Sequence, residues 1–144
     1  MRGATVVALI CVGLLGGCAT PDLGPTPAEL KARWEAQNVY PQNYKADLIA
    51  FLRTYLNDPT HVRNPSVSAP QLKLLSPNDR GERYVTCVRF TARNTDGKYN
   101  PPKEGAATFV SGKLDRFLDS PREAHEFCKD AVFAPFFELE KLTR

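Results

Sequence analysis

The chain has 144 residues, with 19 Lys or Arg against 16 Asp or Glu, so its formal net charge is +3. This length suffices for one globular domain and excludes a multidomain enzyme. Hydrophobic residues make up 42% and charged residues 24% of the sequence, which excludes a disordered polyelectrolyte. Length and composition together predict one compact, weakly basic domain. The small net charge gives no reason to expect a nucleic-acid partner.

The first eighteen residues have the layout of a secretory signal peptide. Arg2 precedes an apolar run over residues 4–15, which is too short for an ordinary membrane-spanning helix and ends in small residues. The tetrapeptide Leu15-Gly16-Gly17-Cys18 resembles the lipobox of bacterial lipoproteins. The resemblance implies cleavage before Cys18 and a lipid on its thiol. The alternative is an ordinary signal peptide whose cleavage site contains a cysteine.

The expected processing divides the chain into a signal peptide (1–17), a lipidated tether (18–26) and a single domain (27–144). Two or three acyl chains anchor a protein stably, so we expect the membrane to be a partner through this lipid. Ala19, in place of Asp, follows the lipobox cysteine. Under the enterobacterial sorting rule this favours the outer membrane, facing the periplasm, over the inner membrane.

The four cysteines have three expected fates. Cys11 leaves with the signal peptide and Cys18 takes the lipid, so Cys87 and Cys128 remain in a compartment where disulfides persist. We predict that these two cysteines pair. The rival interpretations are a reactive thiol and a metal site. His125 and Cys128 have a His-x-x-Cys spacing, but no second ligand pair completes a four-ligand set, so no metal site is predicted.

Three helices are expected. Thr26-Pro27-Ala28-Glu29 is a capping box with proline at the first helical position, which predicts a helix to about Gln37. A continuous apolar stripe predicts a second helix over residues 43–56. Ser120-Pro121-Arg122-Glu123 predicts the start of a third helix, with its inner side ending at Cys128.

Four strands are expected between the second and third helices. They cover residues 67–75, 84–92, 106–110 and a segment from the Ser111-Gly112 turn to Phe117 or Leu118. Residues 61–65 are expected to be a polar stretch outside the sheet, and residues 76–81 a hairpin loop. The aromatic tail over residues 133–142 is expected to pack as a short helical turn over the sheet edge.

The strand over residues 84–92 alternates, with Val88 and Phe90 on a core face and Cys87 and Arg89 on the other. It is therefore predicted to be central. The predicted fold class is α+β, with helices packed on a four-stranded antiparallel meander and the C-terminal helix tied to the sheet by the disulfide.

Four segments carry a resemblance to a family of small alphaproteobacterial lipoproteins. These are residues 40–45, 55–60, 84–90 and the tail from Cys128 to Leu142. The resemblance covers about residues 38–142 and implies the lipid anchor and the disulfide, but no activity and no catalytic residues. The order of helices and strands is also similar to that of small accessory lipoproteins of the outer-membrane assembly machinery, although no motif establishes that kinship.

The sequence predicts no catalytic residue and no cofactor. It has no Gly-x-Ser-x-Gly elbow, zincin helix or phosphate loop, and the two histidines are interpreted as ordinary surface or partly packed side chains. A binding site for an anionic partner is predicted where Arg89, Arg93, Lys98 and Lys103 could gather on one strand face and its following loop. The alternative is a solvated sheet face interrupted by acidic residues.

These features predict a non-enzymatic envelope lipoprotein that binds a protein, or a polymer such as peptidoglycan or lipopolysaccharide, at the periplasmic side of the outer membrane. One alternative is a periplasmic inhibitor of lysozyme-type hydrolases. The other is a small thiol-dependent enzyme that uses Cys87 or Cys128 with His61 or His125.

Overall fold

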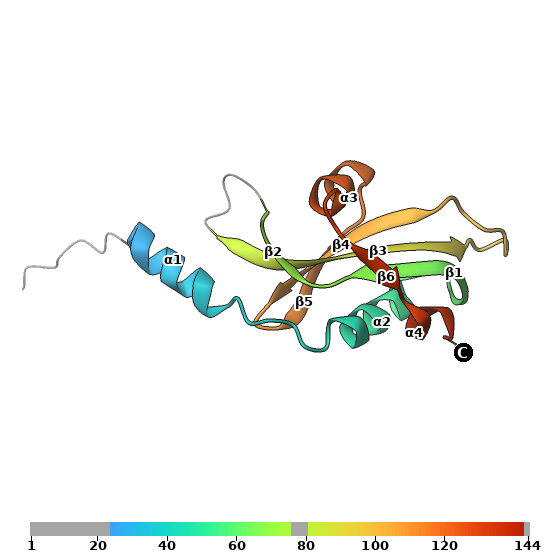
Figure 1. Cartoon of the computed structure of the whole chain (residues 1–144), viewed down its shortest axis with the longest axis horizontal. Helices are drawn as coiled ribbons and strands as arrows, with labels where there is room; N and C mark the ends of the chain where they lie inside the picture. Colours follow the sequence, from blue (N-terminus) through green and yellow to red (C-terminus); the bar gives the residue numbers. More distant parts are fainter. Residues whose placement is uncertain (1–23, 76–80, 143–144) are drawn as a thin grey trace, which may run out of the picture.

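A computed structural model describes residues 24–75 and 81–142 of the chain (Figure 1). The helices are α1 (Pro27–Ala36), α2 (Tyr44–Tyr55), α3 (Pro121–Cys128) and α4 (Phe137–Glu140). The strands are β1 (Asp58–Ser68), β2 (Gln71–Leu74), β3 (Glu82–Arg93), β4 (Lys103–Val110), β5 (Lys113–Leu118) and β6 (Phe133–Pro135). The α+β class is confirmed.

The sheet is larger than predicted and is not a simple meander. It has six strands in the order β5-β4-β3-β1-β6, with β2 also paired to β3. All of these pairs are antiparallel. The prediction of four strands was therefore wrong. The central place of β3 is confirmed, because β3 pairs with β4 along one edge and with β1 and β2 along the other.

The first error concerns residues 58–68, most of which were expected to lie outside the sheet. They form β1, which is irregular: its register against β3 shifts twice, and His61 and Asn64 have φ angles of 57° and 49°. Residues that must adopt a positive φ interrupt a regular strand as bulges, so no alternating pattern marks this segment in the sequence. The single strand predicted over residues 67–75 is divided at Ala69-Pro70 into the end of β1 and the separate β2.

The second error concerns the ends of the predicted sheet. β4 begins at Lys103, three residues before the predicted start at Ala106. In the tail, β6 extends the sheet beyond β1, and the helical turn α4 follows it, where only a helical turn was expected. The hairpin loop predicted over residues 76–81 lies largely outside the described residues. The tight turn at Ser111-Gly112 is confirmed, with φ angles of 51° and 75° that suit a two-residue hairpin loop.

The three predicted helices are confirmed. Thr26 and Glu29 form the reciprocal capping box of α1, and Ser120 caps α3. α1 contains no buried residue and extends away from the sheet in Figure 1. It contacts the sheet through Trp34, whose ring lies 3.7 Å from the guanidinium carbon of the buried Arg83. Among the described residues, no helix has the length and apolar content needed to cross a membrane.

The two faces of the sheet are covered differently. α2 and α4 lie on one side and α3 on the other (Figure 1). The main core lies under α2 and α4 and includes Val88, Phe90 and Leu52, whereas a smaller core lies under α3 and includes Cys87. The predicted division of β3 into a core face and a disulfide face is therefore confirmed.

The predicted disulfide is also confirmed. Cys87 on β3 and Cys128 at the end of α3 are bonded, with their Cα atoms 5.7 Å apart, and both residues are buried. α3 packs on β3 and β4 at this face of the sheet. Arg89, two residues further along β3 on the same face, is exposed.

Candidate functional site

The four predicted anion-binding residues do not gather on one face. In the β3–β4 ladder Arg89 lies opposite Glu104, whereas Lys103 lies opposite the core residue Phe90. Cross-strand partners share a face, so Lys103 is on the opposite side of the sheet from Arg89. Because the start of β4 was placed too late in the sequence analysis, the side on which Lys103 lies was not assigned.

A different arginine completes the basic group. Arg63 on β1 lies opposite Thr91 and therefore shares a face with Arg89 and Arg93. The guanidinium carbon of Arg63 lies 3.8 Å from the ring centre of Tyr99, and that of Arg93 lies 5.1 Å from the same ring. Both distances are typical of cation–π contacts, which fix the orientation of a guanidinium without occupying its N–H groups.

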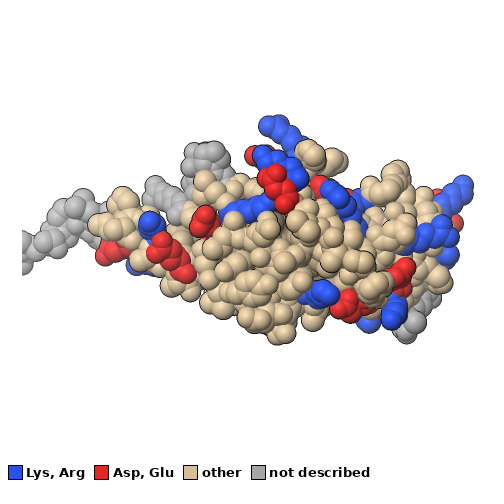
Figure 2. Space-filling model, in the orientation of Figure 1, with Lys and Arg blue, Asp and Glu red and all other residues tan. Residues whose placement is uncertain are grey.

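We define the basic surface as Arg63, Arg89, Arg93 and Lys98. Figure 2 shows lysine and arginine side chains at the end of the molecule that carries the β3–β4 loop. Arg89 is paired with Glu104 at 2.5 Å and stacks on Phe133 at 3.9 Å, and Lys98 is exposed in the loop.

Arg93 is the least satisfied member of the basic surface. Its Nε atom is buried and has no hydrogen-bond partner within the described part of the chain. A buried N–H group without a partner is uncommon and costs free energy. The buried Nε is not open to solvent, so an anion would have to bind the terminal N–H groups of Arg63 and Arg93, neither of which forms a salt bridge within the described residues.

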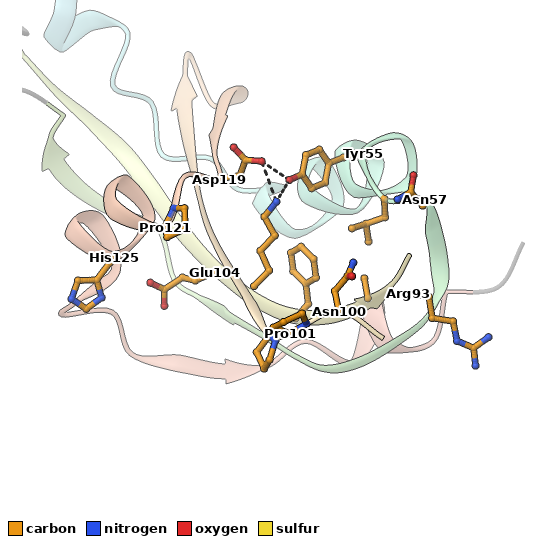
Figure 3. A pocket seen from close by; sticks show the side chains of 14 residues that line it. Tyr55, Asn57, Arg93, Asn100, Pro101, Glu104, Asp119, Pro121 and His125 are labelled. Carbon is orange, nitrogen blue, oxygen red and sulfur yellow. Dashed lines mark hydrogen bonds and ion pairs between the residues drawn. The ribbon is translucent and has the colours of Figure 1, made fainter. Parts of the chain in front are cut away.

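A cleft lies between the end of α2, the β3–β4 hairpin and the start of α3 (Figure 3). Its lining comes from both faces of the sheet, with Lys103 on one and Glu104 on the other, and it shares Arg93 with the basic surface. Its volume is about 930 Å³. Apolar side chains that line it are Leu56, Phe90, Ala92, Pro101, Pro102 and Pro121. Polar side chains that line it are Tyr55, Asn57, Arg93, Asn100, Lys103, Glu104, Asp119 and His125.

Three of these side chains form one hydrogen-bonded cluster. The Tyr55 hydroxyl donates to Asp119 Oδ2 at 2.6 Å, and the Lys103 ammonium donates to the Tyr55 oxygen and to Asp119 Oδ2, the latter at 3.1 Å. The three residues come from α2, β4 and the segment after β5, and Figure 3 shows their polar ends meeting at one point. We call this group the Tyr55–Lys103–Asp119 cluster.

The cluster holds each member in its ordinary ionisation state at neutral pH. Burial and the hydrogen bond to Asp119 raise the pKa of the Tyr55 phenol. Burial lowers the pKa of Lys103, but its hydrogen bonds to Tyr55 and Asp119 outweigh this and leave the pKa above its usual value. Hydrogen bonds from Tyr55 and Lys103 lower the pKa of Asp119. Catalytic acids and bases commonly have pKa values shifted toward the working pH, and none of these three shifts is in that direction.

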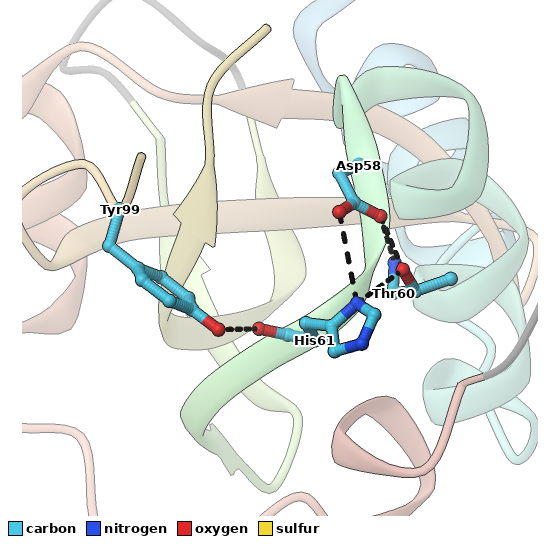
Figure 4. A network of polar contacts seen from close by, with 4 residues as sticks. All are labelled: Asp58, Thr60, His61 and Tyr99. Atoms are coloured by element: carbon cyan, nitrogen blue, oxygen red, sulfur yellow. Dashed lines mark hydrogen bonds and ion pairs between the residues drawn. The ribbon is translucent and has the colours of Figure 1, made fainter. Parts of the chain in front are cut away.

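A second polar network surrounds His61 (Figure 4). Asp58 Oδ1 accepts hydrogen bonds from the Thr60 amide at 2.9 Å and from the Thr60 hydroxyl at 2.5 Å. Since this hydroxyl donates to Asp58, it accepts from His61 Nδ1 at 2.8 Å. The Tyr99 hydroxyl donates to the His61 carbonyl at 3.0 Å.

This network resembles a nucleophile–histidine–carboxylate set only in composition. The Thr60 hydroxyl already donates to Asp58, so His61 is not placed to remove its proton. The network instead holds the backbone of β1 at the bulge and connects it to the loop that carries Tyr99. Both histidine side chains are exposed, as expected, and His125 lies at the rim of the cleft.

The disulfide affects one of the alternatives raised by the sequence. A thiol-dependent enzyme would need a free Cys87 or Cys128, and both sulfurs are engaged in the bond. Within residues 24–75 and 81–142, no group of three or more His, Cys, Asp or Glu residues is arranged to hold a metal ion.

Sequence analysis missed the Tyr55–Lys103–Asp119 cluster for a physical reason. Tyr55 and Asp119 are 64 positions apart and neither belongs to a motif, so only the packing of α2 beside β5 brings them together. Arg63 was missed because its segment was not recognised as a strand. The buried residues Val62 and Val67 mark this segment as a strand in the structure. In the sequence, Asn64-Pro65 lies between them and interrupts the alternation of apolar and polar residues that would indicate a strand.

No protein-family model matches the chain, and the comparisons with curated proteins and with solved structures gave no match.

Proposed function

We propose that this protein is a non-enzymatic, lipid-anchored envelope protein whose basic surface binds a phosphate- or carboxylate-bearing polymer at the periplasmic side of the outer membrane. The lipobox-like segment Leu15-Gly16-Gly17-Cys18 supports the lipid anchor. The disulfide is consistent with an oxidising compartment.

The observation that carries the binding proposal is the pair of guanidiniums on Tyr99. Arg63 and Arg93 stack on one ring, and neither forms a salt bridge with a carboxylate in the described residues. Guanidiniums that are oriented in advance lose little rotational freedom when they bind a phosphate or a carboxylate in a bidentate manner.

Lipidation is tested on the mature protein. We expect the mass of the purified N-terminal peptide to equal that of Cys18 plus acyl chains, and a Cys18→Ala variant to lose its partition into detergent. A mature protein that begins elsewhere, without added mass, would overturn the anchor.

Anion binding is tested with the full lipidated protein in nonionic detergent and purified lipopolysaccharide as the probe. We expect the Arg63→Gln/Arg93→Gln double variant to bind at least tenfold more weakly, and higher salt to weaken the wild type because surface charges are screened. The matched control is Arg53→Gln/Arg122→Gln, which removes the same charge from exposed positions on α2 and α3. Equal affinity for dephosphorylated lipopolysaccharide, or equal loss in both double variants, would contradict the proposal.

A further inference from the structure

We propose that the cleft beside the Tyr55–Lys103–Asp119 cluster is a binding site for an uncharged saccharide. This inference goes beyond the proposed function and does not depend on the lipid anchor or on the basic surface. It is carried by the hydrogen-bonding pattern, the charge balance and the apolar floor of the cleft.

The hydrogen-bonding pattern favours hydroxyl groups. Asp119 offers acceptors only, and its Oδ1 atom takes part in none of the hydrogen bonds of the cluster. Lys103 offers donors only, and two hydrogen bonds leave one of its three N–H groups available. A carboxylate and an ammonium 3.1 Å apart match a ligand in which neighbouring groups both donate and accept. Vicinal hydroxyls of a sugar meet this requirement.

Two amides extend the same pattern around the rim. Asn57 follows α2 and Asn100 lies in the β3–β4 loop, and both residues are exposed. Each amide combines donor and acceptor groups, as a hydroxyl does. Figure 3 shows both amides among the side chains that line the cleft, together with Tyr55 and Asp119.

The charge balance disfavours an ionic ligand. Two cationic residues and two carboxylates line the cleft, namely Arg93, Lys103, Glu104 and Asp119. The guanidinium of Arg93 points away from the cleft in Figure 3, and Glu104 is paired with Arg89 on the other face of the sheet. The charges that remain at the mouth are those of Lys103 and Asp119, which neutralise each other.

The apolar floor and the size fit a short oligosaccharide. The buried residues Phe90 and Ala92 line the cleft together with Leu56 and Pro101. Such a surface can pack against the C–H groups of a pyranose ring. A volume of about 930 Å³ lies at the upper end of the range usual for small-ligand pockets, so it admits more than one ring.

No residue type in the cleft suggests that the bound ligand is cleaved. Of the described residues that line it, none is Ser, Thr or Cys. The two carboxylates that line the cleft are Glu104 and Asp119. Asp119 is held as an anion by Tyr55 and Lys103, and Glu104 is paired with Arg89. A glycosidase needs one carboxyl group that remains protonated.

The test is calorimetric titration of the full lipidated protein in nonionic detergent with three tetrasaccharides. We expect saturable binding of chitotetraose or maltotetraose, which are uncharged. Tetragalacturonate is titrated into the Arg63→Gln/Arg93→Gln variant, so that the basic surface does not contribute, and should bind at least tenfold more weakly. Asp119→Asn is expected to weaken the binding of the uncharged ligand at least tenfold. The matched control is Asp115→Asn, an exposed carboxylate on β5 outside the cleft.

Because Asp119→Asn also alters the cluster, two further variants keep the test decisive. Asn57→Ala and Asn100→Ala truncate exposed rim side chains and are expected to weaken binding at least threefold while the unfolding midpoint stays at the wild-type value. The proposal is overturned if neither uncharged tetrasaccharide binds, if tetragalacturonate binds the Arg63→Gln/Arg93→Gln variant more tightly than both do, or if all three cleft variants bind like the wild type.

Discussion

Gly105 lies directly against the ring of Phe117. A methyl group at residue 105 would come within 2.8 and 2.9 Å of the Cε1 and Cε2 atoms of that ring, so only glycine fits beneath it. The same ring packs on Phe51 at 4.9 Å and on Tyr55 at 5.3 Å between ring centres. The absence of a side chain at residue 105 therefore determines where Tyr55 lies, and with it the cluster at the cleft.

We predict that Gly105→Ala lowers the free energy of unfolding by about 1–3 kcal/mol, the usual cost of overpacking a filled core. Urea denaturation measures this change. In the double variant Gly105→Ala/Phe117→Leu, the smaller side chain leaves room for the new methyl group. The double variant should therefore lose less stability than the sum of the two single variants. Simple additivity would contradict the close approach of these two residues.

The elements that sequence analysis predicted correctly are those whose local pattern agrees with their environment. The alternation of β3 placed Phe90 in the core and Arg89 outside it, and the capping boxes placed the starts of α1 and α3. In these segments the hydrophobic period and the capping groups are local properties of the chain.

The elements that were missed depend on pairing with distant residues. Nothing local makes a strand of the residues before Ala106, since Pro101 and Pro102 precede Lys103 and Glu104. They join the sheet because β3 offers them partners, and this pairing decides that Lys103 faces Tyr55 while Glu104 faces Arg89. The cleft was not foreseen because it exists only once these sides are fixed.

The disulfide provides a second prediction. Replacing Cys87 and Cys128 together by alanine should lower the free energy of unfolding by about 2–5 kcal/mol, because the bond constrains a loop of 41 positions in the unfolded chain. Urea denaturation of the oxidised wild type and of the double variant measures this difference. In the native, unreduced mature protein, a thiol-reactive label should modify neither cysteine. Modification of both would show that the bond does not form.

The cluster gives a prediction for pH. Hydrogen bonds from Tyr55 and Lys103 lower the pKa of Asp119 below its value in the unfolded chain, so the ionised carboxylate stabilises the folded state. This contribution is complete above about pH 4 and is lost as the pH falls through the lowered pKa. The pKa values of Tyr55 and Lys103 are raised, so their protonated forms stabilise the folded state. This stabilisation is lost at alkaline pH, as the pH rises beyond about 10.

The pH prediction is measured as the difference in unfolding free energy between the wild type and Asp119→Asn. Because about half of the Asp119 side chain is exposed, the difference should be no more than about 1 kcal/mol between pH 5 and pH 9. It should shrink toward zero by about pH 2. The control variant Asp115→Asn should show a smaller difference across the range. A difference that grew on acidification would contradict the direction of the Asp119 shift.

The bulge in β1 provides the last prediction. His61 adopts a φ of 57°, a region that costs most residues about 1–2 kcal/mol but is open to glycine and tolerated by asparagine. We therefore expect His61→Gly and His61→Asn to match or exceed the stability of the wild type. His61→Val should be less stable by about 1–2 kcal/mol, because a β-branched residue suits that region poorly. Urea denaturation of the three variants separates the backbone demand at this position from the hydrogen bond between His61 Nδ1 and Thr60. If the glycine and asparagine variants are as unstable as the valine variant, the contact between His61 and Thr60 matters more than the backbone angle. If the valine variant is as stable as the wild type, the positive φ is not required.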